Sequence, residues 1–419
     1  MRLIAAIIVL AAVGVADAQT DVRLRVTAEG RIAIRIGFAE PEKKPEDDVI
    51  EYHTALIDIL TEDLDMSGYF EIVEDLKAGD PHTVVRIGTE RRSAELSFDV
   101  NLKDRASDQT IFRRRYGGAT DQVAMVAHVV ADDIVYALTG RQGIANSQMA
   151  FVAGDRGESY LYMMHIDGSQ LKPLTQTASI IMSPDWSPDG NRIAYASYEA
   201  GYPAMYVLDI PGKTTTRFAS FEGMNATPSW SPDGKKIALT LSKDGNPEVY
   251  VLSLDGKLRK RLTHYSGIDC SPTWAPNGFE LAFTSDRTGS PQIFVVDLQG
   301  ISARRVTFEG SYNTSPAWSP EGHLIAYVSR IDGRFQICTV DPFGITTRVL
   351  TEHGSNEHPN WSPDGMHIVF SSKTGANSGI YIMNGDGSGK RRIFEGLTNP
   401  RDPAWAARPR YAKPEPLEG

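Results

Sequence analysis

Short apolar runs recur along the last two thirds of the chain at a nearly constant interval. Each run of three, such as 193–195 or 237–239, begins seven residues after a tryptophan and follows a polar turn. The six tryptophans that mark the period are Trp186, Trp230, Trp274, Trp318, Trp361 and Trp405. A repeat of about 44 residues with strand-like content predicts a β-propeller in which each period forms one four-stranded blade.

The residues around each tryptophan explain the repeat. Proline stands two residues before every tryptophan, where a strand begins and the missing N–H is tolerated. These prolines are Pro184, Pro228, Pro272, Pro316, Pro359 and Pro403. After five of the six tryptophans comes a turn of the type Ser-Pro-Asp-Gly, whose proline presets the turn and whose glycine accepts positive φ.

The two ends of the array complement each other. Residues 149–175 match the second, third and fourth strands of the unit, with no tryptophan strand before them, and 403–405 is a first strand with nothing after it. We therefore expect the last strand to complete the first blade and to close a six-bladed propeller over 148–408. The tryptophans are expected to pack between neighbouring blades rather than to contact a ligand.

A different pattern precedes the propeller and predicts a small α/β domain over 31–140. A strand is expected at 31–38, a helix ending at Ser67-Gly68 and a second helix ending at Gly140. Further strands are expected at 83–88, 94–102 and 110–116. His128 and Asp132, four residues apart on the second helix, are interpreted as an exposed or capping pair.

The first 18 residues read as a signal peptide: Arg2, an apolar run over 3–15, and Ala16-Asp17-Ala18 as a cleavage pattern. That run is too short to span a bilayer, and we expect no other membrane span. An arm over 19–30 follows, in which 21–27 alternates apolar and polar residues. Such a strand can pair within its own domain or with a partner's sheet edge, and both readings stay open. Residues 409–419 are expected to be a C-terminal tail.

Charge and cysteine content narrow the function. The 419 residues carry a formal net charge of −10, which argues against a nucleic-acid partner because that needs a concentrated basic patch. Cys270 and Cys338 occupy different places in the repeat, so a disulfide between them is not expected.

No catalytic motif accompanies the propeller. A serine hydrolase needs a G-x-S-x-G elbow and a catalytic domain, and the sequence has neither. It contains no H-E-x-x-H and no cysteine pair at zinc spacing, and 384–387 is explained as a hairpin turn. We therefore expect no catalytic residue, no cofactor and no metal. A propeller that binds a small ligand or glycan in its channel remains the alternative to a protein-binding one.

The chain resembles the TolB family of the bacterial Tol-Pal system. Besides the repeats, the resemblance rests on 22–27, on Asp63-Leu64 with 67–70, and on Ala127-His128 with Asp132 before 138–140. It covers essentially the whole mature chain. It implies a periplasmic, non-enzymatic, monomeric protein that links TolA to Pal, the peptidoglycan-associated lipoprotein, in support of outer-membrane invagination during cell division and of outer-membrane integrity. Other outer-membrane proteins and bacteriocins are further implied partners, and membrane insertion is not.

The resemblance also implies two binding sites. The lipoprotein would dock on the loops before the tryptophan strands, 222–227, 266–271, 309–315 and 353–358. The candidates there are Glu222, Met224, Asn225, Thr227, Cys270, Ser271, Glu309, Asn313, Glu357 and His358. TolA would bind the arm, through Asp21, Val22, Arg23, Leu24, Arg25 and Val26. In the family this arm can be free or folded back, depending on what fills the propeller.

Overall fold

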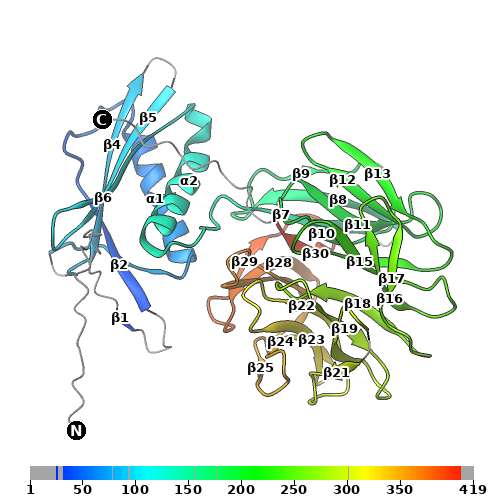
Figure 1. Ribbon diagram of the computed structural model, residues 1–419. Helices are drawn as coiled ribbons and strands as arrows, with labels where there is room; N and C mark the ends of the chain where they lie inside the picture. The colour runs from blue at the N-terminus through cyan, green and yellow to red at the C-terminus, as the bar shows by residue number, and fades with distance from the viewer. Residues whose placement is uncertain are drawn as a thin grey trace, which may run out of the picture. The chain divides into compact units, whose positions relative to one another are not determined.

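The computed structural model divides the chain into two compact units (Figure 1). One, here called the sheet unit, comprises residues 1–50 and 69–117, and the other, the propeller unit, comprises 51–68 and 118–419. The structure describes residues 25–26, 32–77, 79–92, 95–155, 157–176, 178–300 and 302–406. The expected signal peptide and C-terminal tail lie outside these residues.

The sheet unit is a mixed sheet in the order β1-β2-β4-β5-β6, with β3 also paired to β2. The strands β2, β3 and β4 run parallel to one another, and β4 pairs antiparallel with β5 from Thr83↔Asp104 to Arg92↔Glu95. The strands are β1 (Arg25–Val26), β2 (Ile32–Ala39), β3 (Phe70–Val73), β4 (Thr83–Arg92), β5 (Glu95–Asp104) and β6 (Thr110–Gly118). The strands expected from the sequence are confirmed, and β3 is an addition to them.

Alternation along β5 places the core of this unit on one face. Leu96, Phe98, Val100 and Leu102 are buried, whereas the residues between them are partly exposed. Successive side chains of a strand point to opposite faces, so every second residue enters the core.

The two expected helices are α1 (Ile50–Met66) and α2 (Val123–Thr139), with a 3₁₀ turn, η1 (Thr120–Gln122), before α2. The helix α2 ends at Gly140, whose left-handed conformation (φ 70°) lets its N–H bond the Tyr136 carbonyl. The helical stretch 120–139 contains an 18-residue window with a mean hydropathy of 1.3, long and apolar enough to cross a membrane, and half of that window is buried. From the sequence we had noted only the leader run for its length and apolar composition, and we had missed that this helix passes the same test, as the buried core helix of a domain also can.

The interpretation of His128 and Asp132 as an exposed or capping pair was also wrong, because both side chains are buried. Asp132 accepts hydrogen bonds from the backbone nitrogens of Ala145 (2.8 Å) and Asn146 (3.2 Å). His128 Nδ1 lies 2.7 Å from Asp63 Oδ2 on α1. Burial alone would lower the pKa of His128, but the carboxylates of Asp167 and Asp63 raise it to about 9.

The propeller consists of six four-stranded antiparallel sheets. The first blade contains β30 (Arg401–Trp405), β7 (Gln148–Asp155), β8 (Glu158–His165) and β9 (Lys172–Pro173). The second and third contain β10 (Ile181–Trp186), β11 (Arg192–Ser197), β12 (Ala204–Asp209), β13 (Thr214–Ala219), β14 (Asn225–Trp230), β15 (Lys236–Leu241), β16 (Glu248–Ser253) and β17 (Leu258–Arg261). The fourth contains β18 (Asp269–Trp274), β19 (Glu280–Ser285), β20 (Gln292–Asp297) and β21 (Ala303–Arg305). The fifth and sixth contain β22 (Asn313–Trp318), β23 (Ile325–Ile331), β24 (Arg334–Val340), β25 (Thr347–Val349), β26 (Ser355–Trp361), β27 (His367–Thr374), β28 (Asn377–Asn384) and β29 (Arg391–Phe394).

The ring closes as predicted from the ends of the array. The strand β30 pairs antiparallel with β7, with Trp405 opposite Met149 and Ala404 opposite Ala150 (Figure 1). Because the last strand of the chain is the inner strand of the first blade, closure joins segments some 250 residues apart in sequence.

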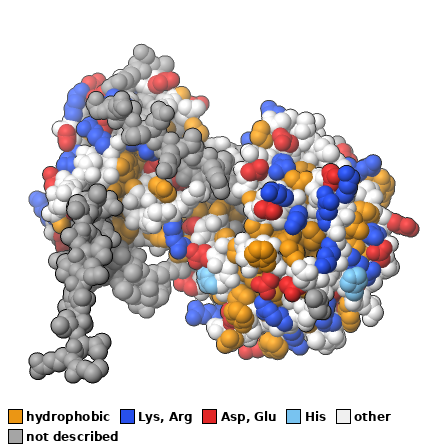
Figure 2. Space-filling model, viewed as in Figure 1, with side chains coloured by type: hydrophobic (Ala, Val, Ile, Leu, Met, Phe, Trp, Pro, Cys, Tyr) orange, Lys and Arg blue, Asp and Glu red, His pale blue; other side chains and the backbone are white. Residues whose placement is uncertain are grey.

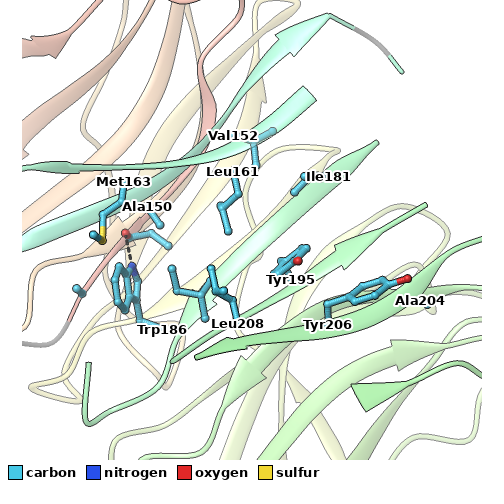
Figure 3. Packing of buried hydrophobic residues seen from close by; sticks show 13 residues of the cluster. Ala150, Val152, Leu161, Met163, Ile181, Trp186, Tyr195, Ala204, Tyr206 and Leu208 are labelled. Atoms are coloured by element: carbon cyan, nitrogen blue, oxygen red, sulfur yellow. Dashed lines mark hydrogen bonds between the residues drawn. The ribbon is translucent and has the colours of Figure 1, made fainter. Parts of the chain in front are cut away.

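The six tryptophans are buried between blades, as predicted. Trp186 packs among residues of the first two blades, including Ala150, Met163 and Leu208, and its Nε1–H donates to the Ala404 carbonyl (Figure 3). The indoles of Trp274 and Trp361 make the same bond to the preceding blade. Trp230 differs, because its buried Nε1 has no hydrogen-bond partner in the described part of the chain.

Candidate functional site

One end of the propeller is formed by the connections that enter the tryptophan strands. In an antiparallel four-stranded blade these connections lie at the same end as the hairpins between the second and third strands. The hydrogen bonds agree: Met224 N donates to Ser242 Oγ (2.7 Å), in the β15–β16 hairpin, and Arg330 N donates to the Tyr312 carbonyl (3.0 Å). We call this end the mouth.

A ring of six residues in the left-handed conformation surrounds the channel at the mouth. Each stands three residues before a tryptophan, at a β-bulge in the first strand of its blade, and each has φ between 47° and 55°. This channel ring consists of Ser183, Thr227, Ser271, Ser315, His358 and Asp402. Non-glycine residues in this region cost about 1–2 kcal/mol each, so the bulge shape is imposed by the surrounding fold.

Polar contacts link neighbouring members of the channel ring. Asp402 accepts a hydrogen bond from Ser183 N (3.0 Å), and its other oxygen lies 3.1 Å from His358 Nδ1. Thr227 and Ser271 are linked through Thr240, whose Oγ1 lies 2.7 Å from Thr227 Oγ1 and accepts a hydrogen bond from Ser271 N (3.1 Å). The channel ring and the adjacent prolines enclose a volume of about 140 Å³, which is small for a channel lined by six blades.

Outside the channel ring lies an arc of exposed apolar side chains. Ile180, Met224, Ile268 and Tyr312 each stand six residues before a tryptophan, and each is 36–47% exposed. They belong to the second to fifth blades, whereas the sixth and first blades have Ser355 and Asn399 at this position. We call these four residues the mouth arc. From the sequence we had singled out Met224 alone, although the shared offset from tryptophan would have found the others.

All ten residues expected to bind the lipoprotein lie at the mouth, and they differ in how far their side chains are buried. Glu222, Met224 and Glu309 are exposed. Thr227, Cys270, Ser271, Glu357 and His358 are half-buried, and Asn225 and Asn313 are buried.

The buried asparagines hold their loops. Asn225 Nδ2 donates to the Phe221 carbonyl (2.7 Å), and Asn313 Nδ2 donates to Gln292 Oε1 (2.8 Å) and to the Glu309 carbonyl (2.7 Å). Neither amide faces solvent, so each shapes its loop rather than presenting a contact surface.

A buried carboxylate organises the loop before β18. Glu248 accepts hydrogen bonds from Thr263 Oγ1 and from Tyr265 N (2.6 Å), and Arg261 Nη2 lies 3.0 Å away. Burial by itself would raise the pKa of Glu248, but these hydrogen bonds lower it. The charged carboxylate therefore fixes the loop that presents Ile268.

The mouth combines features of a protein-binding surface. Apolar side chains are displayed in an arc, polar groups line its centre, and buried amide and carboxylate groups hold its loops in one shape. Over the visible face of the propeller, basic and acidic side chains are interspersed with apolar ones rather than gathered by sign (Figure 2). A surface of this kind suits a folded protein partner, because anchoring apolar groups are surrounded by polar ones.

The arm is described at two residues only. Arg25 and Val26 form β1 and pair antiparallel with β2, Arg25 opposite Ala33 and Val26 opposite Ile32. At these two residues the arm is an edge strand of its own sheet unit, and pairing of the arm with a partner's sheet stays a prediction. Asp21, Val22, Arg23 and Leu24 lie outside the described residues.

Comparison with known proteins identifies the family. The model of the TolB β-propeller domain matches residues 135–408, about two thirds of the chain. The chain belongs to the TolB family. The protein named Tol-Pal system protein TolB from Geobacter sulfurreducens is 33% identical over 214 residues, which cover 46% of this chain and 50% of that relative. The protein of the same name from Bordetella parapertussis is 31% identical over 210 residues, covering 46% and 47%. The chain thus spans about half the length of these curated relatives.

A solved TolB structure extends the similarity to both units. The crystal structure of TolB from Acinetobacter baumannii is 30% identical and superposes with a TM-score of 0.78. The match covers 89% of this chain and 96% of that one. The resemblance noted from the sequence is therefore confirmed, together with the α/β region and the six-bladed propeller.

Proposed function

We propose that this protein is a non-enzymatic, periplasmic component of the Tol-Pal system that binds Pal at the mouth and TolA through the arm. Its place in the TolB family supports this, as do relatives named Tol-Pal system protein TolB. The protein would thereby connect the inner-membrane TolA complex to the outer membrane, and support invagination during division and outer-membrane integrity. Other outer-membrane proteins and bacteriocins would be further partners, and bacteriocins would use the same propeller surface during import.

The mouth arc is the observation that carries the proposal. Four equivalent positions on consecutive blades hold exposed Ile180, Met224, Ile268 and Tyr312, and the loops beneath them are held by buried Asn225, Asn313 and Glu248. Apolar groups presented on a preorganised surface bind a partner at low entropic cost. Catalysis does not require an arc of exposed apolar side chains, so this feature favours partner binding over an enzymatic role.

The alternative, a small ligand or glycan in the channel, fits less well. The channel holds about 140 Å³ at the mouth and about 240 Å³ along the tryptophan strands, each less than the about 300–1,000 Å³ typical of small-molecule pockets. The channel ring also satisfies some of its own polar groups, as in the contacts of Asp402 with Ser183 and His358. A glycan would have to widen the ring and break these contacts.

Binding of the soluble domain of Pal from the same bacterium tests the mouth. We expect Ile268→Asp to weaken binding at least about tenfold, because a charge would be buried at the contact. Ile345→Asp is the matched control: Ile345 is 82% exposed, in the connection between β24 and β25 at the opposite end of the blade. Calorimetry that detects no binding by the wild type, or equal losses in both variants, would contradict the proposal.

The arm is tested separately. Deleting residues 19–27 should abolish binding to TolA and leave Pal binding largely intact, and TolA would have to displace β1 from β2 or extend the same sheet. We further propose a two-state switch, in which the differential affinity of one partner for the two arm positions changes the availability of the arm to the other. If the deletion leaves both affinities unchanged, the arm and its switch are excluded.

A further inference from the structure

Two histidines and two aspartates from distant parts of the propeller unit meet in one buried cluster. His128 lies on α2, Asp63 on α1, His165 ends β8, and Asp167 lies in the turn after it. His128 and His165 are buried, with ring centroids 4.4 Å apart, and the Asp167 side chain is 34% exposed. Asp167 therefore gives the cluster one side open to solvent.

Each ring has a polar partner on the side away from Asp167 that can take its proton. His128 Nδ1 lies 2.7 Å from Asp63 Oδ2, and an ionised carboxylate accepts, so Nδ1 is the protonated nitrogen. His165 Nε2 lies 3.4 Å from Asn146 Oδ1, which can accept the proton of that ring if Nε2 carries it. Neutral rings in these tautomers keep free lone pairs on His128 Nε2 and His165 Nδ1.

Both lone pairs face the carboxylate of Asp167. His128 Nε2 is 3.3 Å from Asp167 Oδ2, and His165 Nδ1 is 3.2 Å from Asp167 Oδ1. His128 Nε2 is buried and makes no hydrogen bond of normal geometry within the described residues. Lone pairs and a carboxylate directed at one another repel unless a proton or a cation lies among them.

The spacing and charge suit a divalent metal ion. The nearest ligand atoms of His128, His165 and Asp167 all lie within 4.8 Å of one another. Zinc bonds of about 2.0–2.1 Å in tetrahedral geometry would place neighbouring ligand atoms about 3.3 Å apart, close to the two separations to Asp167. Asp63 and Asp167 carry two negative charges, which a dication balances.

We propose that His128 Nε2, His165 Nδ1 and the Asp167 carboxylate bind one Zn²⁺, with solvent at the fourth position. Two imidazoles and a carboxylate are ligands that Zn²⁺ accepts, and three protein ligands leave one position open. Asp63 and Asn146 orient the two rings from behind, as outer carboxylates and carbonyls do at zinc sites. The ion would tie α2 to the β8–β9 turn, and it is independent of the proposed partners.

From the sequence we expected no metal, because the chain has no H-E-x-x-H motif and no cysteine pair at zinc spacing. The two histidines of this cluster are 37 residues apart in the sequence. Only the meeting of α2 with the first blade brings them together. The competing state has a proton on His128 Nε2 or His165 Nδ1, donated to Asp167, and holds no metal ion.

Zinc titration of the full chain decides between these states. After treatment with chelator and removal of any affinity tag, the wild type should bind one Zn²⁺ per chain by calorimetry. His165→Asn and Asp167→Asn should each weaken that binding at least about tenfold, and Asp63→Asn about 10–100-fold. His264→Asn, at an exposed histidine outside the cluster, should bind as the wild type does.

Thermal unfolding supplies the second readout. Saturating Zn²⁺ should raise the Tm of the wild type and of His264→Asn, because an ion that binds only the folded state stabilises it. The Tm of His165→Asn should not rise. The proposal is overturned if the wild type binds no Zn²⁺. It is equally overturned if His165→Asn and Asp167→Asn, folded by circular dichroism, bind Zn²⁺ as tightly as the wild type.

Discussion

Trp186 Nε1–H donates a hydrogen bond to the carbonyl oxygen of Ala404, 3.1 Å away and 218 positions later in the chain. The bond crosses from the second blade to the strand that closes the ring, so it joins the first complete repeat to the last. Trp186 is buried, and the same indole packs against Ala150, Met163 and Leu208.

Removing the indole N–H of Trp186 should destabilise the propeller. Trp186→Phe leaves the Ala404 carbonyl without this donor, at a cost of about 1–3 kcal/mol beyond the loss of ring volume. Trp230→Phe is the matched control, because its buried Nε1 has no partner in the described chain. Urea unfolding should show the larger loss in Trp186→Phe, and equal losses would mean that the bond contributes nothing.

Asp185 should make stability depend on pH. Burial raises its pKa to about 7, so the folded state holds the proton more tightly than the unfolded one. The contribution of Asp185 to the free energy of unfolding is greatest below about pH 4 and is lost as the pH rises towards 7. A shift of this size corresponds to at most about 4 kcal/mol, and because Asp185 is only half-buried in the channel wall its effect should be smaller.

Asp185→Asn should therefore stabilise the protein at pH 8 and have much less effect at pH 4. The amide keeps an acceptor for the Trp230 N–H, now 2.6 Å from Asp185 Oδ2, as Asn360 does for Trp405 N (2.9 Å) in another blade. Urea unfolding at the two pH values measures the difference. A variant that is less stable than the wild type at pH 8 would show that the charge itself is needed.

The two cysteines should be slow to react in the folded protein. Both are free, and burial raises the pKa of Cys338 to about 12 and also raises that of Cys270. At pH 7.5 both thiols are then protonated, and the thiol is much less nucleophilic than the thiolate. Ellman's reagent should modify native protein at least about tenfold more slowly than protein in guanidinium, and Cys338→Ser identifies which thiol accounts for any fast phase.

Two residues of one mouth loop should respond differently to truncation. Asn225→Ala removes a buried donor to the Phe221 carbonyl and should cost about 1–3 kcal/mol. Glu222→Ala, at an exposed position, should change stability by less than about 0.5 kcal/mol. Thermal unfolding checks both, and a stable Asn225→Ala variant would mean that the loop keeps its shape without the amide.

The architecture of the propeller was predictable because its signals are local. Each Pro-x-Trp entry and each glycine turn acts within a few residues, so Pro184 with Trp186 marks a strand start without knowledge of the rest of the chain. The helices α1 and α2 were found by their apolar spacing and their glycine ends for the same reason. The strand β3 was not, because four residues give too short a period to read.

The candidate site was predictable only in part. The offset from tryptophan located the mouth loops, and Met224 was singled out there, but burial within a loop has no local signal. Asn225 and Glu222 are both polar residues of the same loop, and only the fold shows that the first bonds inward and the second faces solvent.

By itself the sequence determined the number of blades, the position of every tryptophan strand and the closure of the ring by the last strand, since each follows from repeated short-range chemistry. Tertiary structure alone decided which side chains meet across long distances in the chain: Trp186 with Ala404, the mouth arc around the channel ring, and His128 with Asp63, His165 and Asp167. The physical reason is that burial and proximity are properties of packed elements, which no spacing along a single strand or helix encodes.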